Sequence, residues 1–568
     1  MMMAPAIKAK MSVAPLRPHG KKGKRTRPHV SCSSSPSTST STPTTSSTSR
    51  SPVTPEYVRA AARSQPWKMG LEPAGEFNDV ASVQIKGTIP DDLIGRAIYA
   101  AGPGRIRLEG ADCNERYGHW FDGDGSVMAV RFEGPDAASV SHRMVAGERL
   151  QEQNALGEGK GMATRGFWTD AGGGWLRNVG RQPSNPRNTA VTVLNGKLLV
   201  LCEGGLPAEM DPQTLETVAL DAVPPGLEPG CFLSAHGKHD AKTGEYFTFG
   251  ARLVGPPALD VVRVGADGRV AAQTTVSLGG NIVFVHDFAV TENHIVILIP
   301  PWVCAFSELL PSILFEGPLG HRFRYDASLG TKAIVLKRDT LEVVGEAVCD
   351  NAFSFYHVAN AFEEPAASGD GVTLRVTLAQ QRDADRPGLE RQFANMYDAE
   401  FDPGHHADLW EHELHVSAAN DSVRFVSRRA VCEGSASGAL ALEFPFVNPA
   451  NAMRKARYAY AVGRSDAPVG GERPTTPSYF DRIQKVDLEH GTSEVHSIPS
   501  GQYANEPLFV ASSSASREDD GYLLCPLYDA TSHELVVRVL DARNVSADAI
   551  CEVRFDRHVP FRFHGYVV

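Results

Sequence analysis

Short stretches of alternating apolar and polar residues make up most of the chain from about residue 80 onward. In TAVTVLNGKLLVLCEGG (189–205) apolar residues flank the dipeptide Asn195-Gly196, and in VGADGRVAAQTTVSL (264–278) they flank Asp267-Gly268. Alternation with a period of two is the pattern of a half-buried β-strand, and such dipeptides favour hairpin turns in which φ is positive. The pattern therefore predicts β-hairpins, while long helical periodicity is scarce.

Similar hairpin phrases recur along the whole chain. They include MDPQTLETVAL, HDAKTGEYFTFG, LKRDTLEVVGEAV and VDLEHGTSEVHSI, and several lie about 30 to 60 residues apart. Strand-rich units at such intervals in one long chain predict an all-β fold, a β-propeller with roughly one four-stranded blade per repeat. A pair of β-sandwiches is the alternative that the pattern leaves open.

Two stretches break the strand pattern. Residues 147–185 predict a partly helical excursion from the blades. Residues 300–320, PPWVCAFSELLPSILFEGPLG, are rich in aromatic and branched side chains and contain few charges. This second stretch is either a buried loop between blades or an exposed apolar patch that contacts a bilayer or a lipid-like ligand. The chain contains no run of 18 apolar residues, so no helix that spans a membrane is predicted.

The first 55 residues differ in composition from the rest. They contain nine Lys or Arg, many Ser and Thr, and no Asp or Glu. This is the composition of an organellar transit peptide, and the HVSCSS stretch predicts plastid import with cleavage near Cys32. A disordered tail is the alternative. We expect residues 1–55 to be separate from a folded region at 56–568.

The charge and the cysteine content of the chain limit which partners and which cellular compartment are expected. Beyond residue 55 the chain has 47 basic and 67 acidic residues, and this acidic balance argues against nucleic acid as a partner. The nine cysteines are scattered with no CxxC spacing. They therefore predict free thiols in a reducing compartment.

Four histidines stand in apolar, strand-like surroundings, separated by 50, 71 and 207 residues. They are His236 in CFLSAHGKHD, His286 in NIVFVHDFAVTENH, His357 in AFSFYHVANAFEE and His564 in RFHGYVV. Each on its own is compatible with an ordinary core histidine. Ligands so distant in sequence need a fold that returns strands to one point, as the axis of a propeller does, so the set predicts a metal site. His405, His406 and His412 stand among polar residues and are predicted to be exposed.

Imidazole binds iron, copper and nickel as well as zinc, whereas structural zinc sites usually contain cysteine. The residues alone therefore do not identify the metal. Metal-binding histidines usually donate their second ring N–H to a carboxylate. Glu203, Glu443 and Glu506 lie in similarly apolar strand ends, where a histidine partner or a strand-end salt bridge would satisfy them.

Several motifs, in order from about residue 80 to the terminus, resemble the carotenoid cleavage oxygenases. They are KGTIPDDLIGRAIYAAGPG, HWFDGDGSVMAVRF, LSAHGKHDAKTGEYFTFG, FVHDFAVTENHIVILIPP, FYHVANAFEE, LEFPFVNP, NEPLFV and FHGYVV. One departure is YAAGPGR, where the family usually has a stretch like RNGPG. It does not involve the histidines.

The resemblance implies a seven-bladed β-propeller with a dome of loops and helices over an axial iron site. By motif, one Fe(II) per subunit would be bound by His236, His286, His357 and His564. Glu203, Glu443 and Glu506 would support the ligands, and the family pattern leaves His236 without a carboxylate. Thr189, in RNTAVTV, matches a position that in some relatives leans over the iron.

The resemblance also implies a reaction. The family cleaves one C=C bond of a carotenoid or apocarotenoid with dioxygen and releases two aldehydes or ketones. Cleavage of a stilbenoid phenolic, polyene isomerisation, or a non-catalytic binding propeller are the alternatives. A monotopic membrane contact through residues 300–317 is expected from relatives. The bond that is cleaved cannot be read from the sequence.

Overall fold

The computed structural model describes residues 56–568 except 109–115, 158–160, 173, 253–255, 315–316, 383–406, 434–437 and 469–477. The targeting prediction for residues 1–55 and the exposure predicted for His405 and His406 lie outside the described residues. The described residues belong to one compact unit.

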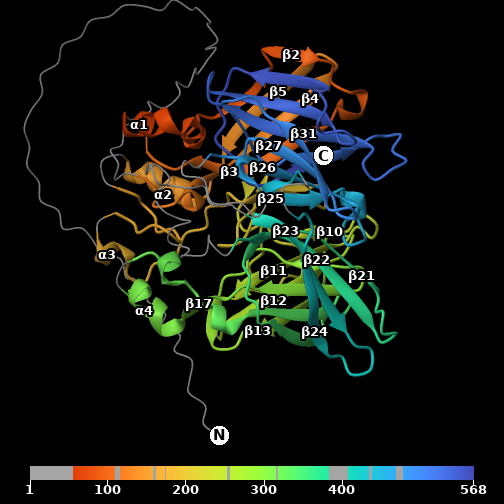
Figure 1. Cartoon of the computed structure of the whole chain (residues 1–568). Coiled ribbons are helices and arrows are strands. Elements are labelled where there is room, and N and C mark those ends of the chain that lie inside the picture. Colours follow the sequence, from red (N-terminus) through yellow and green to blue (C-terminus); the bar gives the residue numbers. More distant parts are fainter. Residues whose placement is uncertain are drawn as a thin grey trace, which may run out of the picture. The chain divides into compact units, whose positions relative to one another are not determined.

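Seven antiparallel sheets of four or more strands follow one another along this unit, and we number them as blades 1 to 7 (Figure 1). Blade 1 has the order β1 (Phe77–Ala81), β5 (Ala137–Met144), β4 (Asp124–Gly134), β3 (Ala97–Arg105) and β34 (Gly565–Val567). Blade 2 contains β6 (Ala190–Leu194), β7 (Lys197–Leu201), β8 (Ala208–Met210) and β9 (Thr217–Ala219). Blade 3 contains β10 (Lys238–His239), β11 (Tyr246–Arg252), β12 (Ala258–Val264) and β13 (Val270–Ser277).

The remaining blades repeat this plan. Blade 4 contains β15 (Ala289–Val290), β16 (His294–Ile299), β19 (Thr331–Lys337) and β20 (Val343–Cys349). Blade 5 contains β21 (Phe355–Pro365), β22 (Val372–Gln381), β23 (Ala407–Val416) and β24 (Val423–Ala430). Blade 6 contains β25 (Leu440–Val447), β26 (Tyr458–Pro468), β27 (Arg482–Asp487) and β28 (Thr492–Ser497). Blade 7 has the order β2 (Gln84–Gly87), β33 (Cys551–Phe555), β32 (Glu534–Asp541), β31 (Gly521–Asp529) and β29 (Gln502–Ala504), and β30 (Leu508–Ala511) also pairs with β31.

Strands from both ends of the described chain close the ring of blades. The early strand β2 pairs with β33 in blade 7, and the C-terminal strand β34 pairs with β3 in blade 1. The innermost strands are neighbours around the ring, because β21 contacts β15 and β25, and β34 contacts β6 and β30. The seven-bladed propeller prediction is therefore confirmed, and the pair of sandwiches is excluded.

Each boundary between neighbouring blades has its own buried hydrophobic cluster. Strand β19 illustrates the cause. Ala333 and Val335 pack toward blade 5, whereas Ile334 and Leu336 pack toward blade 3. Successive side chains of a strand point to opposite faces, so a strand covered on both faces is apolar at every position.

The two predicted hairpin turns differ in detail. Asn195 (φ 50°) and Gly196 (φ 76°) both have the positive φ that a two-residue turn requires. In the second turn only Gly268 does (φ 76°), and the prediction of a positive φ at Asp267 is wrong. The register between β12 and β13 shifts beside this turn, so a bulge takes up the geometry instead.

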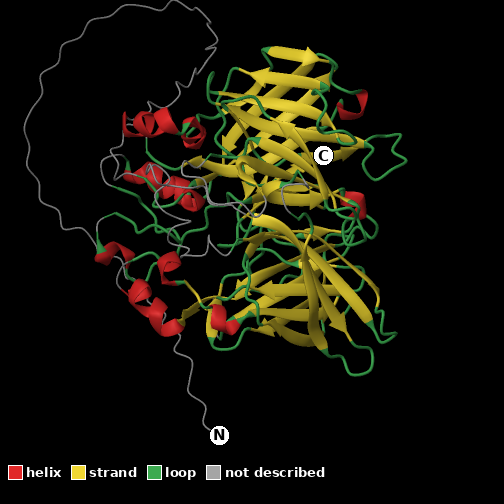
Figure 2. Ribbon diagram, viewed as in Figure 1, coloured by secondary structure: helices red, strands yellow, loops and turns green. Residues whose placement is uncertain are grey.

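Helices and a small sheet leave the blades and form the predicted dome; Figure 2 shows most of the helices along one side of the strands. The helices are α1 (Glu56–Ser64), α2 (Glu148–Leu156), α3 (Trp175–Asn178) and α4 (Phe306–Leu314). The small sheet contains β14 (Asn281–Val283), β17 (Trp302–Ala305) and β18 (Arg324–Tyr325). Short 3-10 turns cover Pro66–Leu71, Asp91–Leu93, Trp120–Asp122, Leu319–Arg322, Ala327–Leu329 and Pro449–Asn451. Within the described residues, no helix has the length and apolar character needed to cross a bilayer.

Candidate metal centre

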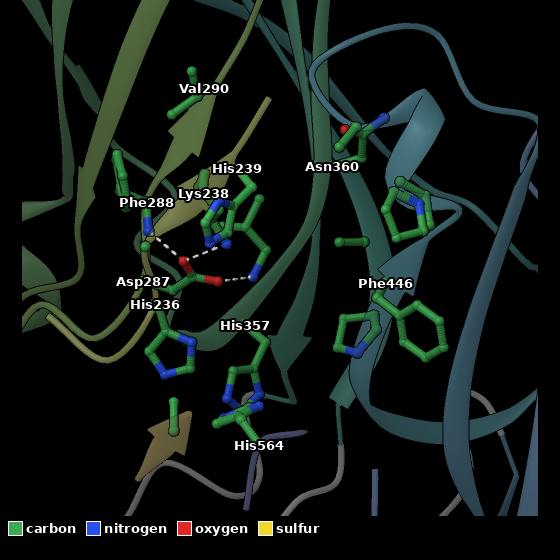
Figure 3. A pocket seen from close by; sticks show the side chains of 18 of the residues that line it. His236, Lys238, His239, Asp287, Phe288, Val290, His357, Asn360, Phe446 and His564 are labelled. Atoms are coloured by element: carbon green, nitrogen blue, oxygen red, sulfur yellow. Dashed lines mark hydrogen bonds and ion pairs between the residues drawn. The ribbon is translucent and has the colours of Figure 1, made fainter. Parts of the chain in front are cut away.

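The four predicted histidines lie at corresponding ends of four innermost strands. His564 directly precedes β34. One residue separates His236 from β10, and two residues separate His286 from β15. His357 is the third residue of β21. The innermost strands of a propeller converge on its axis, so blades 3, 4, 5 and 1 bring the four imidazoles together. Figure 3 shows three of these rings, those of His236, His357 and His564, grouped at one end of a cavity.

The imidazoles are close enough to share one ion. One ring nitrogen from each histidine lies within 4.8 Å of the corresponding atom of every other. The centroid of the His236 ring is 4.2 Å from that of His286, 5.1 Å from that of His357 and 4.6 Å from that of His564. The four side chains are between 7% and 14% exposed. Among the described residues this is the only such group of three or more His, Cys, Asp or Glu.

The donor set fits a divalent metal ion. Within the part of the chain that the structure describes, the buried Nε2 atoms of His236 and His357 have no hydrogen-bond partner. A buried nitrogen lone pair without a donor is costly unless a ligand takes it up. No cysteine belongs to the group, and the seven described cysteines are free thiols. An all-imidazole set is therefore suited to iron, copper or nickel more than to structural zinc.

The three predicted glutamates face three of the histidines. Glu443, in β25 of blade 6, lies with Oε2 2.5 Å from His357 Nδ1, and Glu506 of blade 7 lies with Oε1 3.0 Å from His564 Nδ1. Glu203, which follows β7 of blade 2, has Oε1 3.1 Å from His286 Nδ1.

The same Glu203 oxygen is 3.8 Å from His236 Nε2, which is beyond hydrogen-bond distance. Carboxylates in these places orient imidazoles and raise their basicity as ligands. The structure thus supports three histidines by short carboxylate contacts and leaves His236 without one.

Burial and mutual repulsion favour neutral imidazoles. Burial, with the neighbouring histidines, holds the pKa values of His236 and His357 well below the usual histidine range. Burial also opposes charge on His286, but the adjacent Glu203 carboxylate outweighs it, so the pKa of His286 is raised. Conversely the pKa of Glu203 is lowered, because pairing with His286 outweighs the effect of burial. The shifts at His236 and His357 therefore favour the neutral form that binds a metal ion, whereas the shift at His286 favours its charged form in the metal-free protein.

Thr189 lies at the rim of this group. It immediately precedes β6, is 9% exposed, and its carbonyl oxygen accepts a hydrogen bond of 3.1 Å from the backbone N–H of His564. Its hydroxyl donates to Asn188 Oδ1 at 3.1 Å. Thr189 therefore connects blade 2 to the last histidine through its backbone.

Several residues of the site escaped the sequence reasoning. Phe444 stacks on His357 with ring centroids 5.0 Å apart and has a positive φ of 51°, at a point where the register between β25 and β26 shifts. A proline inside a strand, here Pro445, is a signal for such a bulge. The buried acid Asp287 and its partner Lys238 were also missed, since an acid after a histidine carries no pattern of its own.

The exposure predicted for His412 is wrong. His412 is fully buried in β23, where it stacks on Phe353 with ring centroids 4.1 Å apart and its Nε2 lies 3.0 Å from Gln380 Oε1. Burial holds its pKa near 3. It is a neutral core histidine of blade 5 and is outside the group of four.

A cavity of about 310 Å³ reaches the four-histidine group along the innermost strands. Small side chains from several blades, such as Ala190, Ala235, Ala289 and Ala361, line it together with His236, His357 and His564. Aromatic side chains that are not part of this lining also pack against the histidines. Tyr356 packs edge-on against His286 at 5.4 Å, and Phe284 lies 6.3 Å from the same ring.

Comparison with known proteins shows which family has this arrangement. The family model described as retinal pigment epithelial membrane protein, RPE65, matches residues 71–568. The chain belongs to this family. The match covers every blade and all four histidines, and it confirms the resemblance to the carotenoid cleavage oxygenases that the sequence motifs carry.

Two relatives and one solved structure illustrate the similarity. Apocarotenoid-15,15'-oxygenase from Synechocystis is 30% identical over 91% of this chain and 98% of its own length. The rice protein named 9-cis-epoxycarotenoid dioxygenase NCED1, chloroplastic, is 27% identical over 87% of this chain and 74% of its own length. The crystal structure of cobalt-substituted Synechocystis ACO matches with a TM-score of 0.74 and 27% identity, covering 89% of this chain and 98% of that one.

Proposed function

We propose that this protein is a non-haem Fe(II) dioxygenase that cleaves a C=C bond of a carotenoid or apocarotenoid with O₂ and forms two aldehyde or ketone products. One observation carries the proposal: four imidazoles, two of them buried and two partly buried, converge on the propeller axis without a thiolate, and carboxylates support three of them. The relatives named as apocarotenoid oxygenase and carotenoid dioxygenase share this family.

One Fe(II) per chain would be held by His236, His286, His357 and His564. Such an ion supplies the redox chemistry that dioxygen needs to react with a conjugated double bond. Four neutral ligands would leave the charge of the ion unneutralised, so that it could still attract dioxygen or substrate. Glu203, Glu443 and Glu506 would keep the imidazoles in the orientation and tautomer that direct a ring nitrogen at the ion.

The aromatic surroundings of the histidines suit a polyene. A buried cluster that includes Trp168, Trp302, Phe323 and Tyr356 extends from α4 and β17 to the histidines. Flat aromatic side chains offer a conjugated chain a large apolar contact area.

Incubation of the iron-loaded protein with a panel of carotenoids, apocarotenoids and one stilbenoid tests the proposal. We expect two carbonyl products from a carotenoid or apocarotenoid, each carrying label from ¹⁸O₂. Cleavage of the stilbenoid alone would replace the proposed substrate class, and a changed double-bond geometry without oxygen incorporation would indicate an isomerase. A protein without stoichiometric metal and without turnover would be a binding propeller.

We also propose that the dome docks on a membrane, where polyenes are found. Leu310 of α4 is 41% exposed, and Trp175 and Leu176 of α3 are 51% and 73% exposed. Hydrogen bonds connect the segments beside these helices: Arg165 Nη2 donates to the Gly317 carbonyl at 2.8 Å, and the Gly317 N–H donates to Asp170 Oδ2 at 2.6 Å.

The patch differs from the one that the sequence predicts within residues 300–317. Trp302 is 2% exposed and its indole N–H donates to Ser354 Oγ at 2.8 Å, and Leu309 is 8% exposed. Both are core residues, so that part of the prediction is wrong. Phe315 and the side chains of Phe306, Ile313 and Leu314 lie outside the described residues.

Changing Leu176 and Leu310 together to serine is expected to weaken binding to neutral liposomes several-fold. Each Å² of apolar surface that stays in water instead of entering the bilayer removes about 25 cal/mol from the free energy of binding. Turnover of liposome-embedded carotenoid should fall in parallel, whereas turnover of detergent-solubilised substrate should stay near the wild-type rate. As a control, Val348→Ser changes an equally exposed apolar residue on β20 of blade 4. Equal losses in both variants would contradict a specific patch.

We further propose a plastid location, which the composition of residues 1–55 supports and which the name of the rice relative states for that protein. A fusion of residues 1–55 to a fluorescent reporter is expected to enter plastids, with the mature chain beginning near Cys32. The basic, acid-free segment is the feature that import machinery reads, so replacing its nine Lys and Arg with Gln should leave the reporter in the cytosol. Cytosolic retention of the unchanged fusion would contradict the proposal.

A further inference from the structure

Asp287 is a buried acid that directly follows the ligand His286. Its side chain is 2% exposed, and Figure 3 shows it beside Lys238 and Phe288, with the ring of His236 nearby. Among the described residues, its contacts are with the backbone and with Lys238 and not with the rings of the four histidines. Instead it binds the chain segments that carry them.

Three contacts define the position of this carboxylate. Asp287 Oδ2 accepts a hydrogen bond of 2.7 Å from the backbone N–H of Val358, the residue after His357. Asp287 Oδ1 accepts one of 2.7 Å from the Phe288 N–H and lies 2.7 Å from Nζ of Lys238, which is two residues after His236. One carboxylate thus joins blades 3, 4 and 5 next to three of the four histidines.

We propose that Asp287 and Lys238 are a positioning pair that sets the spacing of His236, His286 and His357 for one metal ion. The inference rests on the metal centre proposed above. Glu203, Glu443 and Glu506 orient individual imidazoles, whereas this pair acts on the backbones that carry them. Metal ligands must be held within about 0.5 Å of their working positions, and strands that belong to different blades have no shared ladder to do so.

Stability alone does not explain a buried ion pair, because replacing such a pair with apolar side chains often costs no stability. Here the carboxylate accepts two backbone N–H groups and one ammonium group, so its charge is satisfied by the segments it connects. Asn at this position keeps the size and one acceptor oxygen. It removes the charge that attracts Lys238, which is 25% exposed.

Titration of the metal-free wild type and of Asp287→Asn with Co(II) tests the proposal, at a temperature where circular dichroism shows both to be folded. We expect the dissociation constant of Asp287→Asn to rise about 10-fold, the size typical of support residues around a metal site. The visible d–d spectrum of bound Co(II), which reports ligand geometry, should change. Lys238→Met should act in the same direction, and Lys238→Arg, which keeps the cation, should restore most of the affinity.

Asp519→Asn is the matched control. Asp519 Oδ2 lies 2.7 Å from Lys485 Nζ, and these side chains are 5% and 6% exposed. This pair belongs to the junction of blades 6 and 7 and lies outside the four-histidine group. We expect its variant to lose thermal stability and to keep the wild-type Co(II) affinity and spectrum.

The possible results distinguish a failure of the positioning role of Asp287 and Lys238 from a failure of the proposed metal centre. Unchanged Co(II) affinity and spectrum in both Asp287→Asn and Lys238→Met would overturn the positioning role and leave the metal centre standing. Equal loss of affinity in Asp519→Asn would also overturn it, because general destabilisation would then explain the effect. A wild-type protein that binds no Co(II) or Fe(II) would overturn the metal centre and this inference with it.

Discussion

Replacing His357 with alanine is expected to abolish metal binding and turnover while the propeller stays folded. The substitution removes one of four nitrogen donors and leaves Glu443, which is 1% exposed, without its imidazole partner. Losing that partner costs about 1–3 kcal/mol of the free energy of unfolding, which a propeller with a hydrophobic cluster at every blade boundary tolerates. Metal analysis should give close to no iron per chain, and product formation should fall below detection.

His412→Ala is the control for this variant. His412 is as deeply buried in the same blade and makes its own stacking and hydrogen-bond contacts, but it is outside the four-histidine group. We expect it to lower the melting temperature and to keep full iron content. Retention of iron and activity in His357→Ala would remove His357 from the ligand set, and loss of iron in both variants would mean that core disruption is the cause.

Replacing Glu443 with glutamine is expected to weaken iron binding and turnover by roughly 10–100-fold. The 2.5 Å contact between Glu443 Oε2 and His357 Nδ1 places a carboxylate where it fixes the ring and increases its basicity. Oε2 also accepts a hydrogen bond of 2.8 Å from the Phe444 N–H. Glutamine keeps the shape and one acceptor oxygen but removes the charge. Iron titration and steady-state kinetics measure the two losses.

Glu411→Gln is the matched control for that change. Glu411 is buried in β23 of blade 5, with a side chain 7% exposed, but it pairs with Arg375 and Arg429 instead of a histidine. We expect it to affect stability and not iron affinity. Wild-type iron affinity in Glu443→Gln would show that this carboxylate serves the fold alone.

Features that depend on local patterns were predictable from the sequence. The two-residue period predicts strands because a pleated strand presents alternate side chains to opposite faces, and the hairpin at Asn195-Gly196 follows from the positive φ that this turn requires. The spacing of the hairpins predicts blades. The four histidines could be recognised as candidates because each interrupts an apolar strand end, where a polar imidazole requires a partner.

Features that depend on what covers a residue were not predictable in the same way. His412 has polar neighbours in sequence and yet is fully buried, because Phe353, just before β21, and Gln380 of β22 enclose it. Trp302 lies in an apolar stretch typical of a surface patch, but Ser354 takes its N–H and the dome covers it. In both cases the deciding partner is more than 30 residues away.

The site shows the same division. By itself the sequence determined which residue types are available for metal chemistry and, through their long separations, that only a fold with converging strands could unite them. The tertiary structure decided which carboxylate faces which imidazole, and that Asp287 binds the backbone of Val358, 71 residues further along the chain. The physical reason is that hydrogen-bond partners are set by the angular order of the blades around the axis, and this order arises only when the two ends of the chain close the ring.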